Sequence, residues 1–259
     1  METARVIDHI VSWLRAYCDG AGLKGFVVGV SGGIDSAVTS TLCAKTEKDV
    51  ILLNMPIYQV LEQLSLAQEH IEWLKQNHHN VRGVHLDLTP TFQSLEASFP
   101  PEVQDGLTMA NTRARLRMLS LYAFASHHKM LVAGTGNKVE DFGVGFYTKY
   151  GDGGVDILPI ADLMKSELYA IGKALGITEA ILKALPTDGL WIDGRTDEAQ
   201  IGATYAELEW AMGFETESHD EDKLNARQKE VLSIYKRLHR ANKHKMDPIP
   251  VCKIPESLK

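Results

Sequence analysis

This sequence of 259 residues has few cysteines, no long apolar run and no excess of positive charge. No apolar stretch approaches the ~20 residues that a membrane-spanning helix needs, so we expect neither a membrane span nor a membrane partner. The first residues carry early acids and have the pattern of an amphipathic helix over Thr3–Asp19, not of a signal peptide. The three cysteines, Cys18, Cys43 and Cys252, are odd in number and far apart, which argues against a disulfide framework and a zinc site. We therefore expect a protein of the reducing cytoplasm.

The formal net charge of −7 argues against nucleic acid as the main partner, because nonspecific binding depends on clustered Lys and Arg that neutralise phosphates. One local exception, Arg113-Ala114-Arg115-Leu116-Arg117, is too short for a duplex-binding face but sufficient for one anionic ligand. At helical spacing, Arg115 continues into an apolar stripe that includes Leu119. An arginine there indicates either a paired anion or an interface, since an unpaired buried charge is costly. Arg113 and Arg117 share another face and are interpreted as ordinary surface residues.

Strand-like and helix-like segments alternate along the chain, whose composition, 44% apolar and 24% charged, is that of a globular protein. Short apolar runs separated by helices predict an α/β fold with a parallel sheet and helices on both faces. In such a sheet, ligands bind beyond the carboxyl ends of the strands. The length suits a single domain over residues 1–259. Strands are expected over Gly25–Val30, Val50–Pro56, Val81–Leu88 and Met130–Gly134, and further helices over Ser36–Lys45, Glu62–Gln76, Leu107–His128, Leu163–Leu175, Asp197–Met212 and Ala226–Asn242.

The most informative segment is the glycine-rich loop Gly29–Ser36, between the first expected strand and the helix that follows. Such a turn leaves several backbone N–H groups unpaired at the positive end of the helix dipole, where a phosphate or pyrophosphate binds. Gly32 and Gly33 allow the backbone to approach the anion, and the two serines of the loop add hydroxyl donors. Asp35 cannot bind a phosphate directly, so its position implies a bridging Mg²⁺. The alternative is a tight turn with glycines for steric reasons.

The loop Gly29–Ser36 differs from two other phosphate-binding patterns. It lacks the lysine of a Walker A motif and the spacing of the dinucleotide fingerprint. It resembles the PP-loop, Ser-Gly-Gly-x-Asp-Ser, of ATP pyrophosphatases, which split ATP between its α and β phosphates. The resemblance implies a Rossmann-like architecture that binds adenine nucleotides.

Further candidate residues lie on the same rim of the expected sheet. Thr135-Gly136-Asn137 directly follows a strand, and Glu140 is placed to be a second carboxylate near Mg²⁺; the alternative for Glu140 is a solvated surface acid. Lys165 lies in the expected first turn of its helix, where a cation opposes the dipole unless an anion such as an ATP phosphate is bound. The alternative for Lys165 is an ion pair with Asp162, a candidate helix cap.

Periodicity disappears between Thr135 and Ile160, a stretch dense in glycine. A segment of this length without regular structure is usually functional, and Phe142, Phe146 and Tyr150 provide apolar anchors. We therefore expect a mobile lid over about residues 135–160. A C-terminal helix and a tail punctuated by prolines are expected over about residues 225–259.

Several segments together resemble the ammonia-dependent NAD⁺ synthetases, over nearly the whole chain. The run Thr148-Lys149-Tyr150-Gly151-Asp152-Gly153-Gly154 is the most specific of them. The resemblance implies a ligase that forms a carbon–nitrogen bond in two steps. The nicotinate carboxylate of deamido-NAD⁺ attacks the α-phosphate of ATP, giving an adenylate and pyrophosphate, and ammonia then releases AMP and NAD⁺. The other segments are Ser31–Ser36, Asn111–Arg115, Gly134–Asn137, Asp156, Pro159–Lys165, Leu185–Thr187, Asp197–Glu198 and His244–Lys245.

The same resemblance implies binding residues for three ligands, which are Mg²⁺, ATP and deamido-NAD⁺. It also implies that Asp35 and Lys165 are the catalytic residues. The protein would be a homodimer whose two subunits share the substrate site. Mg²⁺ would be held by Asp35 and Glu140. ATP would be bound by Gly29, Val30, Ser31, Gly32, Gly33, Ile34, Asp35, Ser36, Thr135, Lys165 and Thr187. Deamido-NAD⁺ would be bound by Arg115, Lys149, Asp156, His244 and Lys245.

Other functions share the PP-loop and stay open at this point. They are a GMP synthetase-like enzyme, a tRNA-modifying ligase, which the net charge of −7 opposes, and a module that binds ATP without turnover. No glutamine-hydrolysing domain fits in this length, so free ammonia is the expected nitrogen donor. A separate glutaminase that supplies the ammonia stays an open alternative.

Overall fold

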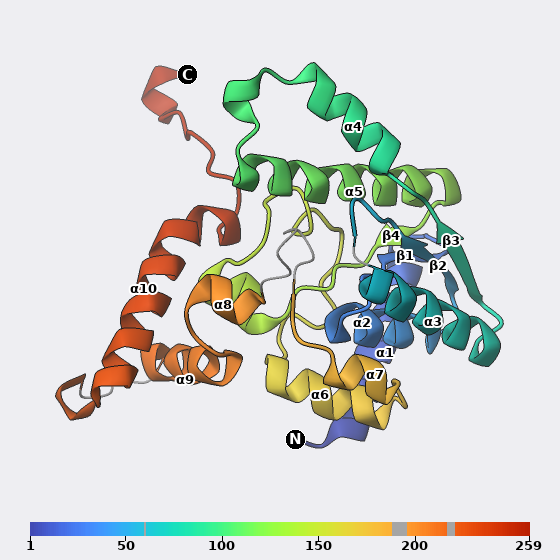
Figure 1. Cartoon of the computed structure of the whole chain (residues 1–259), viewed down its shortest axis with the longest axis horizontal. Coiled ribbons are helices and arrows are strands. Elements are labelled where there is room, and N and C mark those ends of the chain that lie inside the picture. The colour runs from blue at the N-terminus through green and yellow to red at the C-terminus, as the bar shows by residue number, and fades with distance from the viewer. Residues whose placement is uncertain (60, 188–195, 217–220) are drawn as a thin grey trace.

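A four-stranded parallel sheet lies at the centre of the computed structural model, which describes residues 1–59, 61–187, 196–216 and 221–259. The strand order is β3-β2-β1-β4, so the strand that precedes the glycine-rich loop lies inside the sheet (Figure 1). Pairing is in parallel register throughout, with Val27 opposite Ile51 on one side and Val132 on the other. The strands are β1 (Gly25–Gly29), β2 (Asp49–Asn54), β3 (Val81–His85) and β4 (Leu131–Val132).

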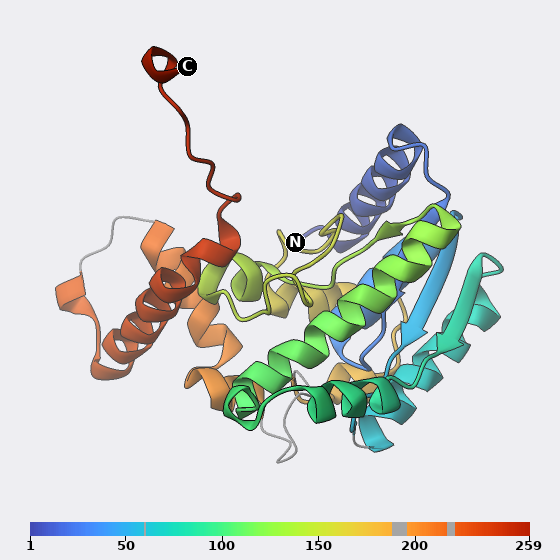
Figure 2. The same cartoon turned by 90° about the horizontal axis from the view of Figure 1, so that it is seen from above.

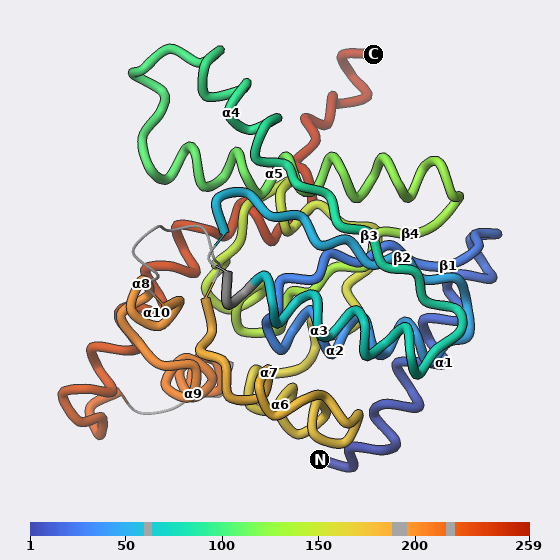
Figure 3. The backbone as a smooth tube through the Cα atoms, turned by 45° about the vertical axis from the view of Figure 1, so that its right-hand side comes forward, coloured from blue at the N-terminus to red at the C-terminus, as the bar shows by residue number. Residues whose placement is uncertain are grey.

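Both faces of the sheet are covered, as the continuous apolar runs of its central strands require. Phe26 and Val28 of β1 pack into one core cluster, whereas Val27 packs into a second cluster on the other face. The first cluster includes residues of α1 (Thr3–Gly20), α2 (Ile34–Ala44), α3 (Leu61–Asn77), α6 (Lys165–Ala174) and α7 (Glu179–Lys183). The second includes residues of α4 (Thr89–Ser98) and α5 (Gly106–His128). Figure 3 shows the two helical layers on either side of the sheet.

A third core cluster is built by helices at one end of the molecule, beside the sheet (Figures 1 and 2). It joins the π-helix η2 (Val139–Val144) to α8 (Asp197–Ile201), α9 (Tyr205–Thr216) and α10 (Ala226–Met246). Short 3-10 turns lie at Pro101–Val103, Glu221–Lys223 and Glu256–Leu258. Among the described helices, none combines the length and the hydropathy that crossing a membrane requires.

The prediction of an α/β fold with a covered parallel sheet is confirmed, but some elements differ. The expected helix Asp197–Met212 is two helices, since Gly202 adopts a left-handed conformation (φ 88°) and ends α8. The segment Thr135–Ile160 contains the π-helix η2, which the sequence pattern did not indicate. Helix α4 was also not expected; it buries only Phe92, so its apolar pattern is weak.

Candidate functional site

A cavity of about 580 Å³ lies beyond the carboxyl ends of β1, β2 and β4. This is the edge at which ligands bind in parallel α/β sheets. The cavity brings together most of the residues that were expected to bind ATP and Mg²⁺. Lining residues from that prediction are Gly29, Val30, Ser31, Gly33, Ile34, Asp35, Ser36, Thr135, Glu140, Lys165 and Thr187.

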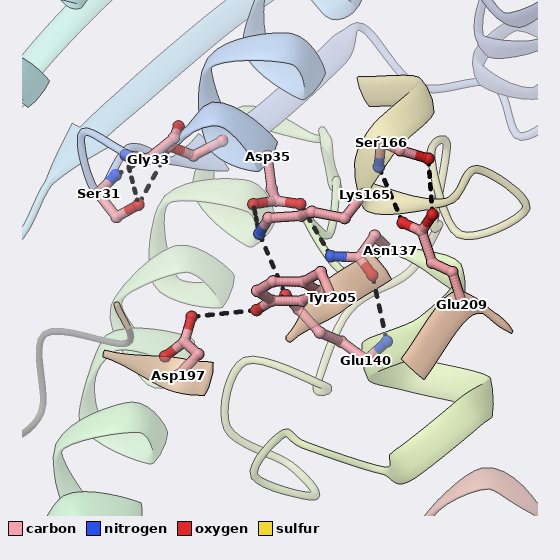
Figure 4. A network of polar contacts seen from close by, with 11 residues as sticks. Ser31, Gly33, Asp35, Asn137, Glu140, Lys165, Ser166, Asp197, Tyr205 and Glu209 are labelled. Carbon is pink, nitrogen blue, oxygen red and sulfur yellow. Dashed lines mark hydrogen bonds and ion pairs between the residues drawn. The ribbon is translucent and has the colours of Figure 1, made fainter. Parts of the chain in front are cut away.

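The glycine-rich loop is held in shape by its own serines (Figure 4). The Ser36 hydroxyl accepts a hydrogen bond from the Ser31 amide (3.2 Å) and donates to the Gly33 carbonyl (3.0 Å). Gly32 has a φ of 89°, a conformation that a side chain would strain. Helix α2 then begins at Ile34, so its N-terminal amides and the positive end of its dipole lie at the cavity. An anion would be stabilised at this position.

The charged centre of the cavity is Lys165, whose ammonium lies between two carboxylates (Figure 4). Its Nζ is 2.5 Å from Asp35 Oδ2 and 3.1 Å from Glu140 Oε1, and only 4% of the side chain is exposed. Burial alone would lower the pKa of Lys165, but the charges of Glu140 and Asp35 outweigh it and raise the pKa above its ordinary value. The lysine is therefore a fixed cation. Asp35 and Glu140 thus both contact Lys165, although these three residues, which were each predicted as site residues, come from three separate parts of the chain.

Asn137 links the Asp35 carboxylate to the backbone of Glu140. Its Nδ2 donates to Asp35 Oδ1 (3.0 Å), and its Oδ1 accepts from the Glu140 amide (3.1 Å). Asn137 is completely buried. The motif Gly134–Asn137 contains this residue, but the sequence indicates no role for it, because a buried amide leaves no periodic signal.

The alternative interpretation of Lys165, an ion pair with Asp162, is wrong. Asp162 pairs instead with Lys138 at 2.8 Å, and the residue that precedes helix α6 is Met164. Lys165 thus begins the helix and extends toward the cavity.

Asp35 and Glu140 fit a magnesium ion. Both carry hard oxygen donors, and they share one cation at present, so they are close enough to share another. Mg²⁺ is commonly bound by one or two carboxylates together with substrate phosphates and water. Across the described ranges, no group of three or more His, Cys, Asp or Glu is arranged for a metal. Phosphate and water oxygens would therefore have to complete the coordination.

Tyr205 of α9 is the main residue of this centre that the sequence did not reveal. Its hydroxyl donates to Glu140 Oε1 at 2.5 Å and lies 3.2 Å from Asp197 Oδ2. Its ring centroid is 4.7 Å from Lys165 Nζ. A tyrosine 65 residues away from Glu140 in the sequence gives no local signal of this contact.

Arg117 was interpreted as an ordinary surface residue, which is wrong. It is partly buried and lines the cavity. Its Nε donates to the Met55 carbonyl (3.0 Å) and its Nη2 to Gln59 Oε1 (3.1 Å), so it connects α5 to the segment after β2.

The residues expected to bind deamido-NAD⁺ fall into three places. Arg115, Lys149 and His244 lie together, because Lys149 Nζ donates to the His244 carbonyl (2.5 Å) and Arg115 Nη2 to the Lys149 carbonyl (3.4 Å). In this basic cluster Arg115 and His244 are exposed and Lys149 is half-buried, and none of the three lines the cavity. In the apolar stripe expected beside Arg115, Leu119 faces outward and is 62% exposed, whereas Met118 lines the cavity.

Asp156 lies apart from that cluster and has local partners. Its Oδ2 accepts from the Val132 amide (2.8 Å), and its Oδ1 accepts from the Tyr122 hydroxyl (3.0 Å). In this state its carboxylate holds strand β4 to the loop that follows Gly154.

Lys245, the fifth of these residues, lines the cavity from α10. Its ammonium donates to the carbonyls of Gly145 and Tyr147, both at 2.8 Å. Burial lowers the pKa of Lys245. Two other side chains of α10 form hydrogen bonds with carbonyls just before Gly145. His239 contacts the Gly143 carbonyl (2.7 Å) and Asn242 donates to the Val144 carbonyl (2.8 Å).

Comparison with known proteins gives a consistent result. A sequence profile described as NAD synthase matches residues 6–249. The NH(3)-dependent NAD(+) synthetase of Methanosarcina acetivorans is 34% identical over 260 residues, which covers 97% of this chain and 98% of that protein. The protein of the same name from Carboxydothermus hydrogenoformans is 39% identical over 207 residues, covering 78% of this chain and 82% of that protein.

Two solved structures are similar over almost their full length. One, an NMN synthetase from Francisella tularensis, has a TM-score of 0.83 and 32% identity, with 99% of each chain covered. The other, an NH3-dependent NAD synthetase from Campylobacter jejuni, has a TM-score of 0.79 and covers 98% of this chain and 100% of that one. At 24% identity, the second similarity concerns the fold alone.

Proposed function

This chain belongs to the NAD synthase family, and we propose that it uses ATP and ammonia to convert deamido-NAD⁺ into NAD⁺. Membership of the family makes it an ATP-using ligase of NAD biosynthesis. The choice of deamido-NAD⁺ among nicotinate nucleotides, the metal and the residue roles are parts of the proposal.

The observation that supports the proposal most directly is the position of Lys165. Its ammonium lies between Asp35 and Glu140 in the cavity that also receives the N-terminus of α2. A phosphate chain at this helix end would meet backbone N–H groups from one side and the ammonium from the other. That arrangement suits charge that develops on ATP as its α–β bond breaks.

No nucleophilic side chain is required, since the substrate carboxylate is itself the nucleophile. One of its oxygens attacks the α-phosphorus, the bond to the β-phosphate oxygen breaks, and pyrophosphate leaves. Ammonia then attacks the acyl carbon, the carbon–oxygen bond breaks, AMP leaves with that oxygen, and the new amide loses a proton. The contribution of the protein is to position the reactants and to stabilise charge.

Each part of the centre has a role in this scheme. The glycine-rich loop would bind the phosphates, and Lys165 would stay beside them as a fixed cation. Asp35 and Glu140 would hold Mg²⁺, which when bound neutralises phosphate charge. Asn137 holds the Asp35 carboxylate and the backbone of Glu140 in place through its two hydrogen bonds.

Nicotinate mononucleotide is a second candidate substrate, favoured by the 32% identity to the NMN synthetase over 99% of both chains. The chemistry would be the same, but the substrate would lack the adenylyl half. Deamido-NAD⁺ needs binding groups for a second phosphate and nucleoside. The basic cluster of Arg115 and Lys149, outside the cavity lining, supports this larger substrate.

The test is a direct comparison of the two nucleotides with purified protein, ATP, Mg²⁺ and ammonium. We expect kcat/KM to be at least tenfold higher for deamido-NAD⁺, a difference of about 1.4 kcal/mol. A preference for nicotinate mononucleotide would reassign the substrate, and no turnover of either would refute the proposal. Glutamine as the sole nitrogen source, in ammonia-free solution without partner proteins, should give no turnover; efficient turnover there would overturn the assignment of ammonia as donor.

A further inference from the structure

We infer that Tyr205 is a positioning residue of the reaction: it fixes the Glu140 carboxylate for the metal ion and keeps Lys165 beside it. This inference rests on the proposed function. It is carried by three contacts that converge on one buried side chain (Figure 4).

The first contact fixes Glu140. The Tyr205 hydroxyl donates to Glu140 Oε1, which also accepts a hydrogen bond from Lys165 Nζ. In the part of the chain that the structure describes, both side-chain contacts of the Glu140 carboxylate fall on Oε1. The arrangement holds the carboxylate in one orientation and keeps Oε2 available to a cation.

The second contact holds Lys165. The ring centroid of Tyr205 is 4.7 Å from Lys165 Nζ, within the range of a cation–π interaction. Tyr205 therefore contacts both members of the ion pair, the carboxylate through its hydroxyl and the ammonium through its ring. Only 6% of the residue is exposed, so water does not compete effectively for these contacts.

The hydroxyl of Tyr205 is the donor in its contact with Glu140, because a carboxylate oxygen accepts the hydrogen bond. One hydroxyl has one proton to donate, and the shorter of its two contacts is with Glu140 rather than Asp197.

The backbone that carries Tyr205 is itself fixed to the site. Glu209, one helical turn further along α9, accepts from both the amide (2.9 Å) and the hydroxyl (2.7 Å) of Ser166. Ser166 directly follows Lys165 at the start of α6. Helix α9 thus holds the beginning of α6 at two adjacent residues, which makes Tyr205 a rigid support rather than a mobile surface tyrosine.

The test compares Tyr205→Phe, which removes only the hydroxyl, with Tyr235→Phe. Tyr235 is 5% exposed, belongs to the same core cluster and contacts neither Glu140 nor Lys165 in any described interaction. The probe is Mn²⁺, titrated in the presence of α,β-methylene-ATP and followed by electron paramagnetic resonance. Loss of a hydrogen-bond partner of a metal ligand typically costs 10–100-fold in metal affinity. We expect the Kd for Mn²⁺ to rise about tenfold or more in Tyr205→Phe and to stay within about twofold in Tyr235→Phe.

A kinetic measurement separates positioning from general damage. In Tyr205→Phe, the Mg²⁺ concentration for half-maximal pyrophosphate release should rise, with the KM for ATP nearly unchanged at saturating Mg²⁺. Unchanged Mn²⁺ affinity in this variant, or an equal loss in Tyr235→Phe, would overturn the inference, as would a wild-type protein that binds no Mn²⁺ with the analogue. The Mn²⁺ titration needs no turnover, so a protein that amidates neither nucleotide would refute the proposed function while leaving this test decisive.

Discussion

The cavity is organised around single charged side chains whose pairing is energetically important. Removing one partner of a buried ion pair typically costs ~3–5 kcal/mol, because the other charge is left uncompensated. Lys165, with 4% of its side chain exposed, depends in this way on Asp35 and Glu140.

Asp35→Asn tests the charge of the first carboxylate while keeping its shape. We expect pyrophosphate release to fall by at least about 100-fold, the loss typical when one charge-stabilising group is removed from an active site. Asp162→Asn is the control, because Asp162 carries an exposed carboxylate at the same end of the molecule, paired only with Lys138 in the described contacts. Near-normal pyrophosphate release by folded Asp35→Asn protein at saturating Mg²⁺ would exclude the role.

Lys149→Ala tests the basic cluster. The cluster lies outside the lining of the cavity, whereas the glycine-rich loop and Lys165 line it. The substitution should therefore raise the KM for deamido-NAD⁺ far more than the KM for ATP. Steady-state kinetics with one substrate saturating at a time measures both, and equal weakening of the two would show that Lys149 is wrongly assigned.

Sequence and structure agree where a residue type has a local reason for its position. Asp35 and Lys165 each stand at the start of a helix, so their chemistry could be predicted from the flanking pattern. Tyr205 and Asn137 could not be predicted, since their partners lie far away in the sequence and burial leaves no periodic trace. For Asp156 the sequence predicted a contact with the substrate, but in the structure its carboxylate accepts hydrogen bonds from Tyr122 and from the Val132 amide of β4.

At the scale of elements, strands β1, β2 and β4 could be predicted because each is largely buried and reads as a short apolar run, whereas the edge strand β3 is only partly buried. Predicted and observed strand starts agree within one residue for β1 and β2. Elements outside the sheet were harder to predict: α4 buries only Phe92, and a single glycine, Gly202, divides α8 from α9. The π-helix η2 depends on packing against α10, which no local pattern specifies.

The segment over residues 135–160 is predicted to be a lid that becomes ordered over bound substrates. Three side chains of α10, His239, Asn242 and Lys245, bond four of its carbonyls, so movement of the segment must break these bonds or carry α10 along. Closure would exclude water from an adenylate that hydrolyses easily.

Backbone hydrogen exchange measures this directly. We expect the amides of residues 145–156 to exchange quickly in the free protein and slowly with α,β-methylene-ATP plus deamido-NAD⁺. Asn242→Ala, which removes the bond to the Val144 carbonyl, should accelerate exchange in the free protein and cost about 1 kcal/mol of stability. Equal protection with and without ligands would mean a rigid loop and no lid.

For the whole molecule, the main prediction concerns assembly. The resemblance to the family implies a homodimer, and α5 offers apolar surface for it, with Leu107 and Leu119 each 62% exposed. Sedimentation equilibrium should give twice the chain mass of 28.7 kDa. Leu119→Glu should weaken the dimer, whereas Tyr17→Glu, on α1 across the sheet, should not. A monomer at micromolar concentration in the unmodified protein would contradict this prediction.

The central claim is that one oxygen of the substrate carboxylate becomes bonded to the α-phosphorus of ATP, so that an acyl adenylate precedes the attack of ammonia. Deamido-NAD⁺ labelled with ¹⁸O in both carboxylate oxygens tests it most directly, with ATP, Mg²⁺ and ammonium in unlabelled water. Breaking the acyl carbon–oxygen bond in the second step must leave one labelled oxygen on the phosphate of AMP, so mass spectrometry should find one ¹⁸O in each AMP and the other in the amide of NAD⁺. Label in pyrophosphate, or AMP without label, would contradict the account.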